Sequence, residues 1–567
     1  MWESLARPEP AFVSECYDNG WWRRQTFLDD VVRAATERPD APAIIEYQGG
    51  EPTRTIRYGE LVDIVDRFAG GLSDLGVGAG DVVLLYLPNV WLIGPMYLAC
   101  ARLGAVAFPL NPAFSARELG LALRVDRVKV CVTVDRYDGK DFAGPLARLA
   151  PPEVHRVVVG DARRTGALDF DATFLDRAGL GGPVVGPDPD SVALLLFTSG
   201  TSGQPKCIAH SYNTLYAAVR SVSVPCGLGP DDTITVPLLL TNMAGSTYSV
   251  LMPLHLGATC VLQDGSDMDL VLDMIERHGV TFVYAVPSYV QNLLAAQRSR
   301  PRDTRTLRHL VSGSTPVPPQ LVDEVTEVLG VELRALWGMT ENGAVTMTRP
   351  DDPPGWASRS DGRPEPWMRV RIEPDESGDP DVGRLLVRGA NQCLGYLGQP
   401  DVYRGCLDDE GWFDTGDTAR DDGRGGIRIT GRRNDLIIRA SGMKVPTLDV
   451  EALLQRHPLV REAVLIGYPD PNTSAAELVC AVVVPDGTAP SLAQLRDHLA
   501  GLGVGEVYWP DRIELLNALP RNSLGKVQRN VLRAELATAH PSPESTATAR
   551  PSPESTASAP ASAPTVR

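Results

Sequence analysis

The sequence predicts an α/β protein with a large N-terminal domain and a small C-terminal domain. Short apolar runs at residues 82–86, 130–134 and 192–197 alternate with helical patterns such as residues 61–75 and 270–278. This alternation is typical of mainly parallel sheets sandwiched by helices. The chain has 567 residues, enough for two or more domains that each bury a core.

Two later regions depart from this pattern. Between residues 383 and 429, short strand patterns with many Gly and Asp turns predict a small antiparallel or barrel-like piece that closes the large domain. After Gly431 a compact α+β unit is predicted, with strands at 435–439, 460–467 and 478–484 and helices at 448–455 and 492–499. We therefore expect an N-terminal domain over residues 1–433 and a C-terminal domain over residues 434–538.

The end of the chain, residues 539–567, consists mostly of Pro, Ser, Thr and Ala, and repeats the sequence PSPESTA at residues 541 and 551. Such a composition cannot bury enough apolar area to become ordered, so we expect a disordered tail.

The composition excludes several classes of protein. A net charge of -17 argues against nonspecific binding to nucleic acid or to an anionic membrane. Nine cysteines without a C-x-x-C pair indicate reduced core thiols and a cytoplasmic protein. The acidic N-terminus does not resemble a signal peptide, and the apolar stretch 82–108 is interrupted by Pro88, Pro95 and Arg102, so no membrane span is expected.

A phosphate-binding loop is the strongest local signal. Hydroxyls, glycines and an ammonium follow the apolar run 192–197 directly, in the order Thr198, Ser199, Gly200, Thr201, Ser202, Gly203, Gln204, Pro205 and Lys206. Glycines let backbone N–H groups close around an anion, and the side chains add donors and charge. The spacing differs from that of a Walker loop. Only five lysines occur in the chain, and three of them, Lys206, Lys444 and Lys526, lie in glycine-marked motifs.

Further motifs follow in a fixed order. They are LGAVAFPLNP at 103–112, GSTP at 313–316, WGMTE at 337–341, DTGD at 414–417, GRRND at 431–435, SGMKV at 441–445 and PRNSLGK at 520–526. Together with the phosphate loop they resemble the adenylate-forming enzymes, the superfamily of acyl-CoA synthetases, adenylation domains and luciferases. The resemblance covers residues 15–536 and implies the cofactors ATP, Mg²⁺ and coenzyme A, or the phosphopantetheine of a carrier protein.

The resemblance implies a role for each matched residue. The phosphate loop holds the pyrophosphate side of ATP, Thr340 contacts the α-phosphate, Glu341 binds Mg²⁺, and Lys526 reaches the α-phosphate and the acyl oxygen. Asp417 accepts hydrogen bonds from the ribose hydroxyls beside Arg432. Gly313, Ser314 and Trp337 line the adenine face, and Thr315, Gly338 and Met339 are further nucleotide-binding residues.

The same resemblance implies a mobile C-terminal domain. It rotates about a hinge at Asn434, where the family usually has Asp or Lys, and brings Gly442 to line the thiol tunnel. Without a side chain, a glycine lets the backbone approach a narrow channel.

The acid is expected to bind in a pocket formed by Asn242, Met243, Gly245, Ser312 and Gly338. Asn242 stands where the family commonly has a histidine, and its amide either hydrogen-bonds a ring hydroxyl or caps a turn. Residues 17–22 and 508–512 look most like ligases for cyclohexanecarboxylate, medium-chain and aryl acids.

The leading hypothesis is an ATP-dependent acid–CoA ligase that forms AMP. Loading of a separate carrier protein is the first alternative, and a luciferase-like oxidation of the adenylate is another. An inactive nucleotide-binding scaffold that contacts partners through its tail is the alternative from a different class.

Overall fold

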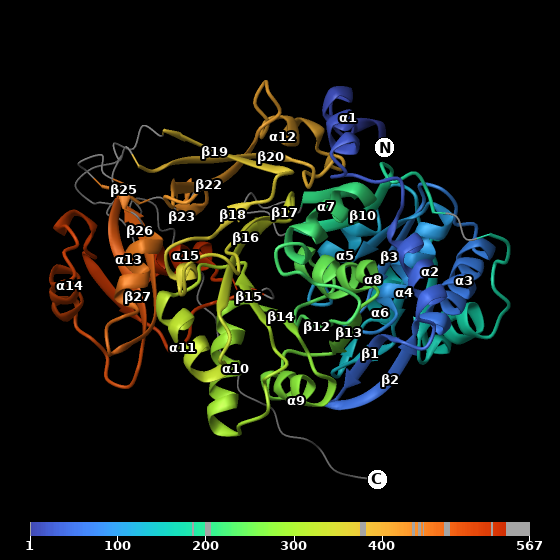
Figure 1. Ribbon diagram of the computed structural model, residues 1–567, viewed down its shortest axis with the longest axis horizontal. Coiled ribbons are helices and arrows are strands. Elements are labelled where there is room, and N and C mark those ends of the chain that lie inside the picture. The colour runs from blue at the N-terminus through green and yellow to red at the C-terminus, as the bar shows by residue number, and fades with distance from the viewer. Residues whose placement is uncertain are drawn as a thin grey trace, which may run out of the picture. The chain divides into compact units, whose positions relative to one another are not determined.

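The computed structural model describes residues 2–183, 186–198, 206–374, 381–433, 437–439, 444–445, 447–469, 477–522 and 526–539. The chain divides into two compact units (Figure 1). One consists of Met1–Asn434 together with Arg521–Val527, and the other of Asp435–Pro520 and Gln528–Arg567. The expected tail falls outside the described residues, apart from Ala539.

The first sheet of unit one has nine strands. Their order is β18 (Arg363–Pro364), β17 (Gly343–Met347), β16 (Leu333–Met339), β15 (His309–Gly313), β14 (Phe282–Ala285), β12 (Thr233–Thr235), β13 (Thr259–Gln263), β1 (Pro42–Gln48) and β2 (Glu51–Arg57). The strands from β16 to β1 pair in parallel, and only the edge strands pair antiparallel.

The second sheet has eight strands and contains the three apolar runs from which the fold class was predicted. Their order is β21 (Gly395–Tyr396), β11 (Lys206–Ser211), β10 (Val192–Thr198), β4 (Val106–Pro109), β3 (Val82–Tyr86), β5 (Val128–Val134), β8 (His155–Val159) and β9 (Leu168–Asp169). It is parallel from β10 to β9, with β11 and β21 added antiparallel.

Helices cover these sheets and bury two apolar clusters. The larger cluster joins the second sheet to α2 (Phe27–Glu37), α3 (Tyr58–Asp74), α4 (Ile93–Leu103) and α7 (Tyr212–Ser223). The other packs the first sheet against α9 (Met268–His278), α10 (Pro287–Ser299) and α11 (Pro319–Leu329), which lie together along one face in Figure 1. The predicted α/β class is confirmed.

Shorter helices complete the large unit. They are α1 (Pro10–Asp18), α5 (Ala116–Ala122), α6 (Ala143–Leu149), α8 (Met252–Leu256) and α12 (Pro400–Arg404), together with a π-helix, η4 (Gly245–Leu251). The predicted antiparallel piece is a four-stranded sheet in the order β19 (Met368–Pro374), β20 (Gly383–Gly389), β22 (Phe413–Asp421) and β23 (Ile427–Arg432).

The second unit is a small α+β structure with its own core. Strands β26 (Val460–Pro469), β27 (Glu477–Pro485) and β28 (Arg512–Leu515) form one sheet, and β24 (Ile437–Ile438) pairs with β25 (Lys444–Val445). Its helices are α13 (Thr447–Leu454), α14 (Leu492–Gly501) and α15 (Arg529–Ala539). Leu454, Leu465, Val483 and Leu499 are almost fully buried in its core.

Two expectations from composition concern the whole chain. All nine cysteines lie in described parts of the chain and are free thiols. Among the described helices, none is both long and apolar enough to cross a membrane.

Candidate functional site

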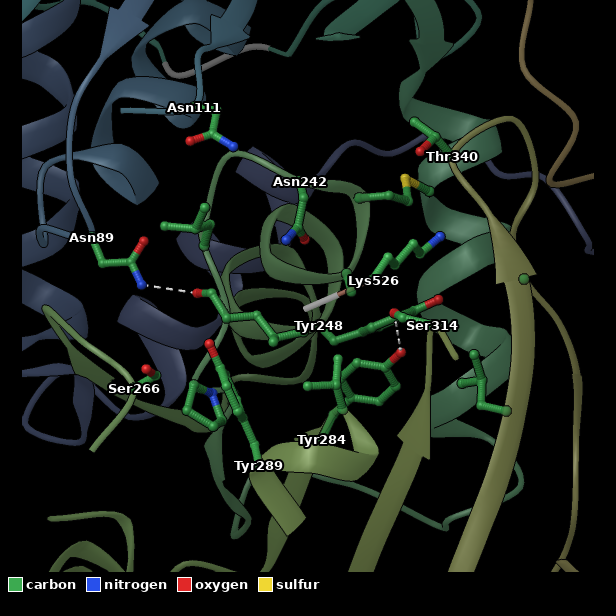
Figure 2. Close-up of a pocket in the computed structure, with 18 of the residues that line it drawn as sticks. Asn89, Asn111, Asn242, Tyr248, Ser266, Tyr284, Tyr289, Ser314, Thr340 and Lys526 are labelled. Carbon is green, nitrogen blue, oxygen red and sulfur yellow. Dashed lines mark hydrogen bonds between the residues drawn. The ribbon is translucent and has the colours of Figure 1, made fainter. Parts of the chain in front are cut away.

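A cavity in the large unit lies where parallel strands of both sheets end. Its volume is about 340 Å³, and Figure 2 shows the side chains that line it. Most of the lining residues lie at or just after the ends of β3 and β4 in the second sheet and of β12, β13, β14, β15 and β16 in the first. In open α/β sheets, ligands bind outside the carboxyl ends of the strands. The topology therefore marks this cavity as the candidate site.

Asn242 caps a turn and also faces the cavity. Its Oδ1 accepts a hydrogen bond from the backbone N–H of Gly245 at 2.7 Å, just where η4 begins. Its Nδ2 has no partner among the described residues, and the side chain points into the cavity in Figure 2. The two interpretations of Asn242 are compatible, because one amide atom caps the turn and the other remains available to a ligand.

The loop that carries Asn242 is fixed by a second asparagine. Asn89 donates from Nδ2 to the carbonyl of Leu238 at 2.8 Å and accepts at Oδ1 from the N–H of Leu240 at 2.9 Å. Because one N–H and one lone pair of the amide are used in this way, Asn89 stabilises the loop.

Tyrosines form much of the opposite wall. The hydroxyls of Tyr284 and Ser314 share a hydrogen bond of 3.1 Å, and Tyr248 accepts from the N–H of Ala344 at 2.9 Å. The Tyr289 hydroxyl has no partner in the described part of the chain and points toward the cavity (Figure 2). The wall therefore combines flat apolar rings with a few polar atoms, as is usual for small-molecule sites.

The pocket residues expected from the sequence fall into two groups. Asn242, Met243 and Gly338 line the cavity, whereas Gly245 and Ser312 are not among its described lining residues. A Cβ at Gly245 would come within 2.0 Å of the Leu239 carbonyl oxygen, so this glycine permits a close backbone approach. Ser312 is fully buried in β15, and its hydroxyl has no hydrogen-bond partner in the described residues.

The turn between β16 and β17 carries Thr340 and Glu341. His210 donates from Nε2 to the Thr340 carbonyl at 2.7 Å. Burial lowers the pKa of His210 to about 4, which keeps the ring neutral at physiological pH. The N–H of Cys393 donates to the Glu341 carbonyl at 2.8 Å. One side-chain and one backbone donor, from two other parts of the large unit, thus fix the backbone of the turn.

The Glu341 carboxylate is buried beside a tyrosine and a lysine. Its Oε1 accepts from the Tyr396 hydroxyl at 2.8 Å, and the Lys206 ammonium lies 3.3 Å from the same hydroxyl. Burial and the Glu341 charge raise the pKa of Tyr396 far above its ordinary range, so the hydroxyl keeps its proton and donates. Of the phosphate loop, the structure describes Lys206 and the backbone of Thr198. Ser199, Gly200, Thr201, Ser202 and Gly203 lie outside the described residues.

Trp337, near the end of β16, meets Asp417, in the middle of β22. The Trp337 indole N–H donates to Oδ2 of Asp417 at 3.1 Å, and Arg432 Nε lies 2.8 Å from Oδ1. Asp417 is buried, whereas Trp337 is only partly buried and keeps ring surface available for stacking. The aspartate, the arginine and the aromatic ring that the sequence singles out therefore form one cluster.

The other expected nucleotide residues lie at the adjoining ends of β15 and β16. Ser314, Gly338 and Met339 line the cavity, while Gly313, Thr315 and Trp337 adjoin them in sequence. A Cβ at Gly338 would come within 2.0 Å of the Gly343 carbonyl oxygen, at a register shift between β16 and β17. Ser314 has a left-handed backbone with φ of 69°. A non-glycine residue in that conformation is often part of a binding site.

Lys526 lines the same cavity in unit one (Figure 2). Its N–H donates to Oδ1 of Asn522 at 2.9 Å, which closes a short loop within Arg521–Val527. Burial, together with the positive charge of Arg432, lowers the pKa of Lys526. Asn434 and Gly442 lie outside the described residues.

The residues around Glu341 suit a metal ion that is coordinated mainly by the phosphates of a bound nucleotide and by few protein side chains. No cluster of three or more His, Cys, Asp or Glu side chains that could hold a metal occurs in the described residues. Mg²⁺ that accompanies phosphates is usually bound by only one or two carboxylates. A single buried carboxylate near the Lys206 ammonium fits that pattern.

Comparison with known proteins identifies the family. A family model described as "AMP-binding enzyme" matches residues 31–397, and "AMP-binding enzyme C-terminal domain" matches residues 449–526. The chain belongs to the AMP-binding enzyme family. This AMP-binding enzyme is accordingly an ATP-dependent, AMP-forming acid–thiol ligase.

Three relatives illustrate the range of the family. "Salicyl-AMP ligase / salicyl-S-ArCP synthetase" of Mycobacterium tuberculosis is 31% identical over 92% of both chains. "Medium-chain fatty-acid--CoA ligase" of Escherichia coli is 27% identical over 91% of both chains. The solved structure of the anthranilate CoA ligase AuaEII with anthranoyl-AMP has a TM-score of 0.81 at 25% identity, covering 91% of this AMP-binding enzyme and 98% of that chain.

Several site residues were not found by sequence reasoning. Tyr396, His210, Asn89 and Tyr289 each contact the site or its supporting loops. Tyr396 lies 55 positions from Glu341, and nothing in the local sequence links the two. Only the pairing of β21 with β11 brings Tyr396 close to Lys206.

Proposed function

We propose that this AMP-binding enzyme activates a carboxylic acid with ATP and transfers the acyl group to coenzyme A. A carboxylate oxygen attacks the α-phosphorus, the bond to the bridging oxygen of the β-phosphate breaks, and pyrophosphate leaves. The deprotonated thiol then attacks the acyl carbon, and AMP leaves with the electron pair of the broken C–O bond. The first step brings anions together, so positioning and charge neutralisation supply most of the catalysis.

Each charged group at the site has a role in this proposal. Lys206 and the hydroxyls of the phosphate loop hold the β- and γ-phosphates. Thr340 and Lys526 stabilise charge on the α-phosphate, and Asp417 accepts from the ribose hydroxyls. Glu341 provides one carboxylate ligand to Mg²⁺, which, when bound with ATP, neutralises phosphate oxygens.

The acid we propose is an aryl acid with a polar ring substituent. The observation that carries this proposal is Nδ2 of Asn242, which has no partner in the described part of the chain and faces a cavity of about 340 Å³ with tyrosine walls. A free donor in an apolar pocket favours a ligand with an acceptor at that point, because an unsatisfied polar group is costly when the ligand excludes water. The salicylate and anthranilate named in two of the relatives are both ring acids with a polar substituent.

A carrier protein is the second candidate for the acceptor. One relative, 31% identical over nearly the whole chain, is named as a salicyl-S-ArCP synthetase. Both acceptors present the same phosphopantetheine thiol. We propose that the C-terminal domain, residues 434–538, moves about Asn434 so that Gly442 lines the path of this thiol. We also propose that the enzyme acts in the cytoplasm, where its free thiols stay reduced.

Acid-dependent exchange of pyrophosphate into ATP tests the proposal. The panel contains benzoate, 2-hydroxybenzoate, 2-aminobenzoate, cyclohexanecarboxylate, octanoate and amino acids. Acids that support exchange are then incubated with coenzyme A, and the thioester is identified by mass. We expect the fastest exchange with the substituted benzoates and a CoA thioester as product. Exchange without a thioester indicates the carrier protein, and exchange only with octanoate contradicts the aryl assignment.

A further inference from the structure

Tyr396 lies between two groups of opposite charge. Its hydroxyl donates to Glu341 Oε1 at 2.8 Å, while the Lys206 ammonium lies 3.3 Å from the hydroxyl oxygen and 4.6 Å from the centre of the ring. Tyr396 itself is 1% exposed and Glu341 is 7% exposed. A single buried hydroxyl therefore contacts both the carboxylate and the ammonium.

The backbone around Tyr396 is fixed to the same turn as Glu341. The Cys393 N–H donates to the Glu341 carbonyl at 2.8 Å, and Asn391 Nδ2 donates to the Ala344 carbonyl at 2.8 Å. Tyr396 pairs with Ile208 of β11, two residues from Lys206. Residues 391–396 thus connect the strand that carries Lys206 to the turn that carries Glu341.

The geometry has an electrostatic consequence. In a poorly hydrated site, an ammonium and a carboxylate attract each other far more strongly than in water. A direct Lys206–Glu341 ion pair would use the lysine needed for phosphate and the carboxylate needed for metal. The Tyr396 hydroxyl gives the carboxylate a donor and the ammonium an acceptor, so both stay satisfied without contacting each other.

We propose that Tyr396 is a positioning residue that keeps Glu341 available to a divalent cation and Lys206 available to the phosphates of ATP. The inference rests on the proposed function, because that function assigns the metal to Glu341. It adds a residue outside the phosphate loop and the Thr340–Glu341 turn to the group that prepares the site for metal–ATP.

Tyr396→Phe tests this role, with Tyr403→Phe as the matched control. The Tyr403 ring packs against that of Tyr396 at 5.2 Å, is equally buried, and donates its hydroxyl to the Cys393 carbonyl at 2.9 Å. Each variant removes one hydroxyl from a buried tyrosine. A general loss of packing or stability would therefore affect the two variants alike.

The main readout is binding of Mn²⁺ with α,β-methylene-ATP, followed by electron paramagnetic resonance of free Mn²⁺. AMP, which requires neither metal nor the pyrophosphate subsite, serves as the second probe. For Tyr396→Phe we expect metal–nucleotide affinity to fall about tenfold and AMP affinity to change less than twofold. For Tyr403→Phe we expect both affinities to stay within twofold of wild type. In steady state, Tyr396→Phe should raise KM for Mg·ATP more than it lowers kcat.

Three results overturn the inference. They are an unchanged metal–nucleotide affinity in Tyr396→Phe, an equal loss of AMP affinity in that variant, or the same loss in Tyr403→Phe. A failure of the proposed function is distinguishable, because then wild-type protein itself binds no Mn²⁺ with α,β-methylene-ATP.

Discussion

Replacing Trp337 with Phe should weaken ATP binding through Asp417. The variant keeps an aromatic ring for stacking but removes the indole N–H that donates to Asp417 Oδ2 at 3.1 Å. A hydrogen bond to a charged group contributes about 1.5–3 kcal/mol, and every 1.4 kcal/mol is a tenfold change in affinity. Arg432 still contacts Oδ1 at 2.8 Å, so we expect the lower end of this range, about a tenfold increase in KM for ATP.

The same variant should also change nucleotide selectivity. A carboxylate held by both Trp337 and Arg432 is oriented to accept from both ribose hydroxyls, so wild-type enzyme should use 2′-deoxyATP and 3′-deoxyATP poorly. Without the indole donor, Asp417 loses part of this orientation, and the preference for ATP over the deoxy nucleotides should shrink. Pyrophosphate exchange at varied nucleotide concentration, with one fixed acid, measures both effects.

Trp367→Phe is the matched control. The Trp367 indole donates to the Ser221 hydroxyl at 3.0 Å in the core, so this variant also removes one tryptophan hydrogen bond from the large unit. Its KM for ATP should stay within twofold of wild type. The reasoning is refuted if Trp337→Phe leaves KM for ATP unchanged, or if Trp367→Phe raises it to the same extent.

Three further predictions concern the acid pocket, the cavity lysine and a buried histidine. Asn242→Asp keeps an oxygen for the Gly245 N–H but loses the donor and adds charge, so KM for the acid should rise about tenfold while urea unfolding stays nearly unchanged; an unchanged KM contradicts the role of Nδ2. Lys526→Ala should abolish adenylate formation yet leave transfer from a supplied acyl-adenylate, and equal loss in both assays removes its assigned role. His309 accepts from Arg334 at Nδ1, and burial lowers the pKa of His309 to about 4. Its unfolded pKa is about 6.5, so its contribution to stability is full above pH 6.5 and is lost as the pH falls toward 4. At pH 5 about 2 kcal/mol should be missing, and His309→Gln should abolish that part of the decrease in urea midpoint.

The apolar runs made the fold class readable from the sequence. Residues 82–86, 130–134 and 192–197 are buried strands because a sheet covered on both faces needs continuous apolar strands. The motifs also identified residues that the fold brings together, such as Trp337, Asp417 and Arg432. A functional residue can be predicted from the local sequence where a motif at a turn or strand carries the functional group itself.

Contacts between segments that are distant in the sequence could not be predicted from these motifs. The sequence named Asn242 but could not show that its Oδ1 caps Gly245 while its Nδ2 faces the cavity, because that depends on the loop conformation fixed by Asn89. Likewise, Tyr396 reaches Glu341 only through an edge strand added to the second sheet. Pairing partners of short edge strands have no signature in local hydrophobic pattern.

Recognition of the acid and binding of the nucleotide are assigned largely to different segments of the chain. Most of the wall comes from segments after β3, β4, β12, β13 and β14, whereas the residues assigned to the nucleotide lie at the ends of β15 and β16, on β22 and β23, in the phosphate loop and at Lys526. Substitutions in the first group, other than at Tyr284, whose hydroxyl bonds to Ser314, can therefore alter which acid is accepted without removing a contact of the groups assigned to ATP. This arrangement offers a route to engineering new acid specificity, beginning at Asn242, Tyr289 and Val286, on an unchanged adenylation centre.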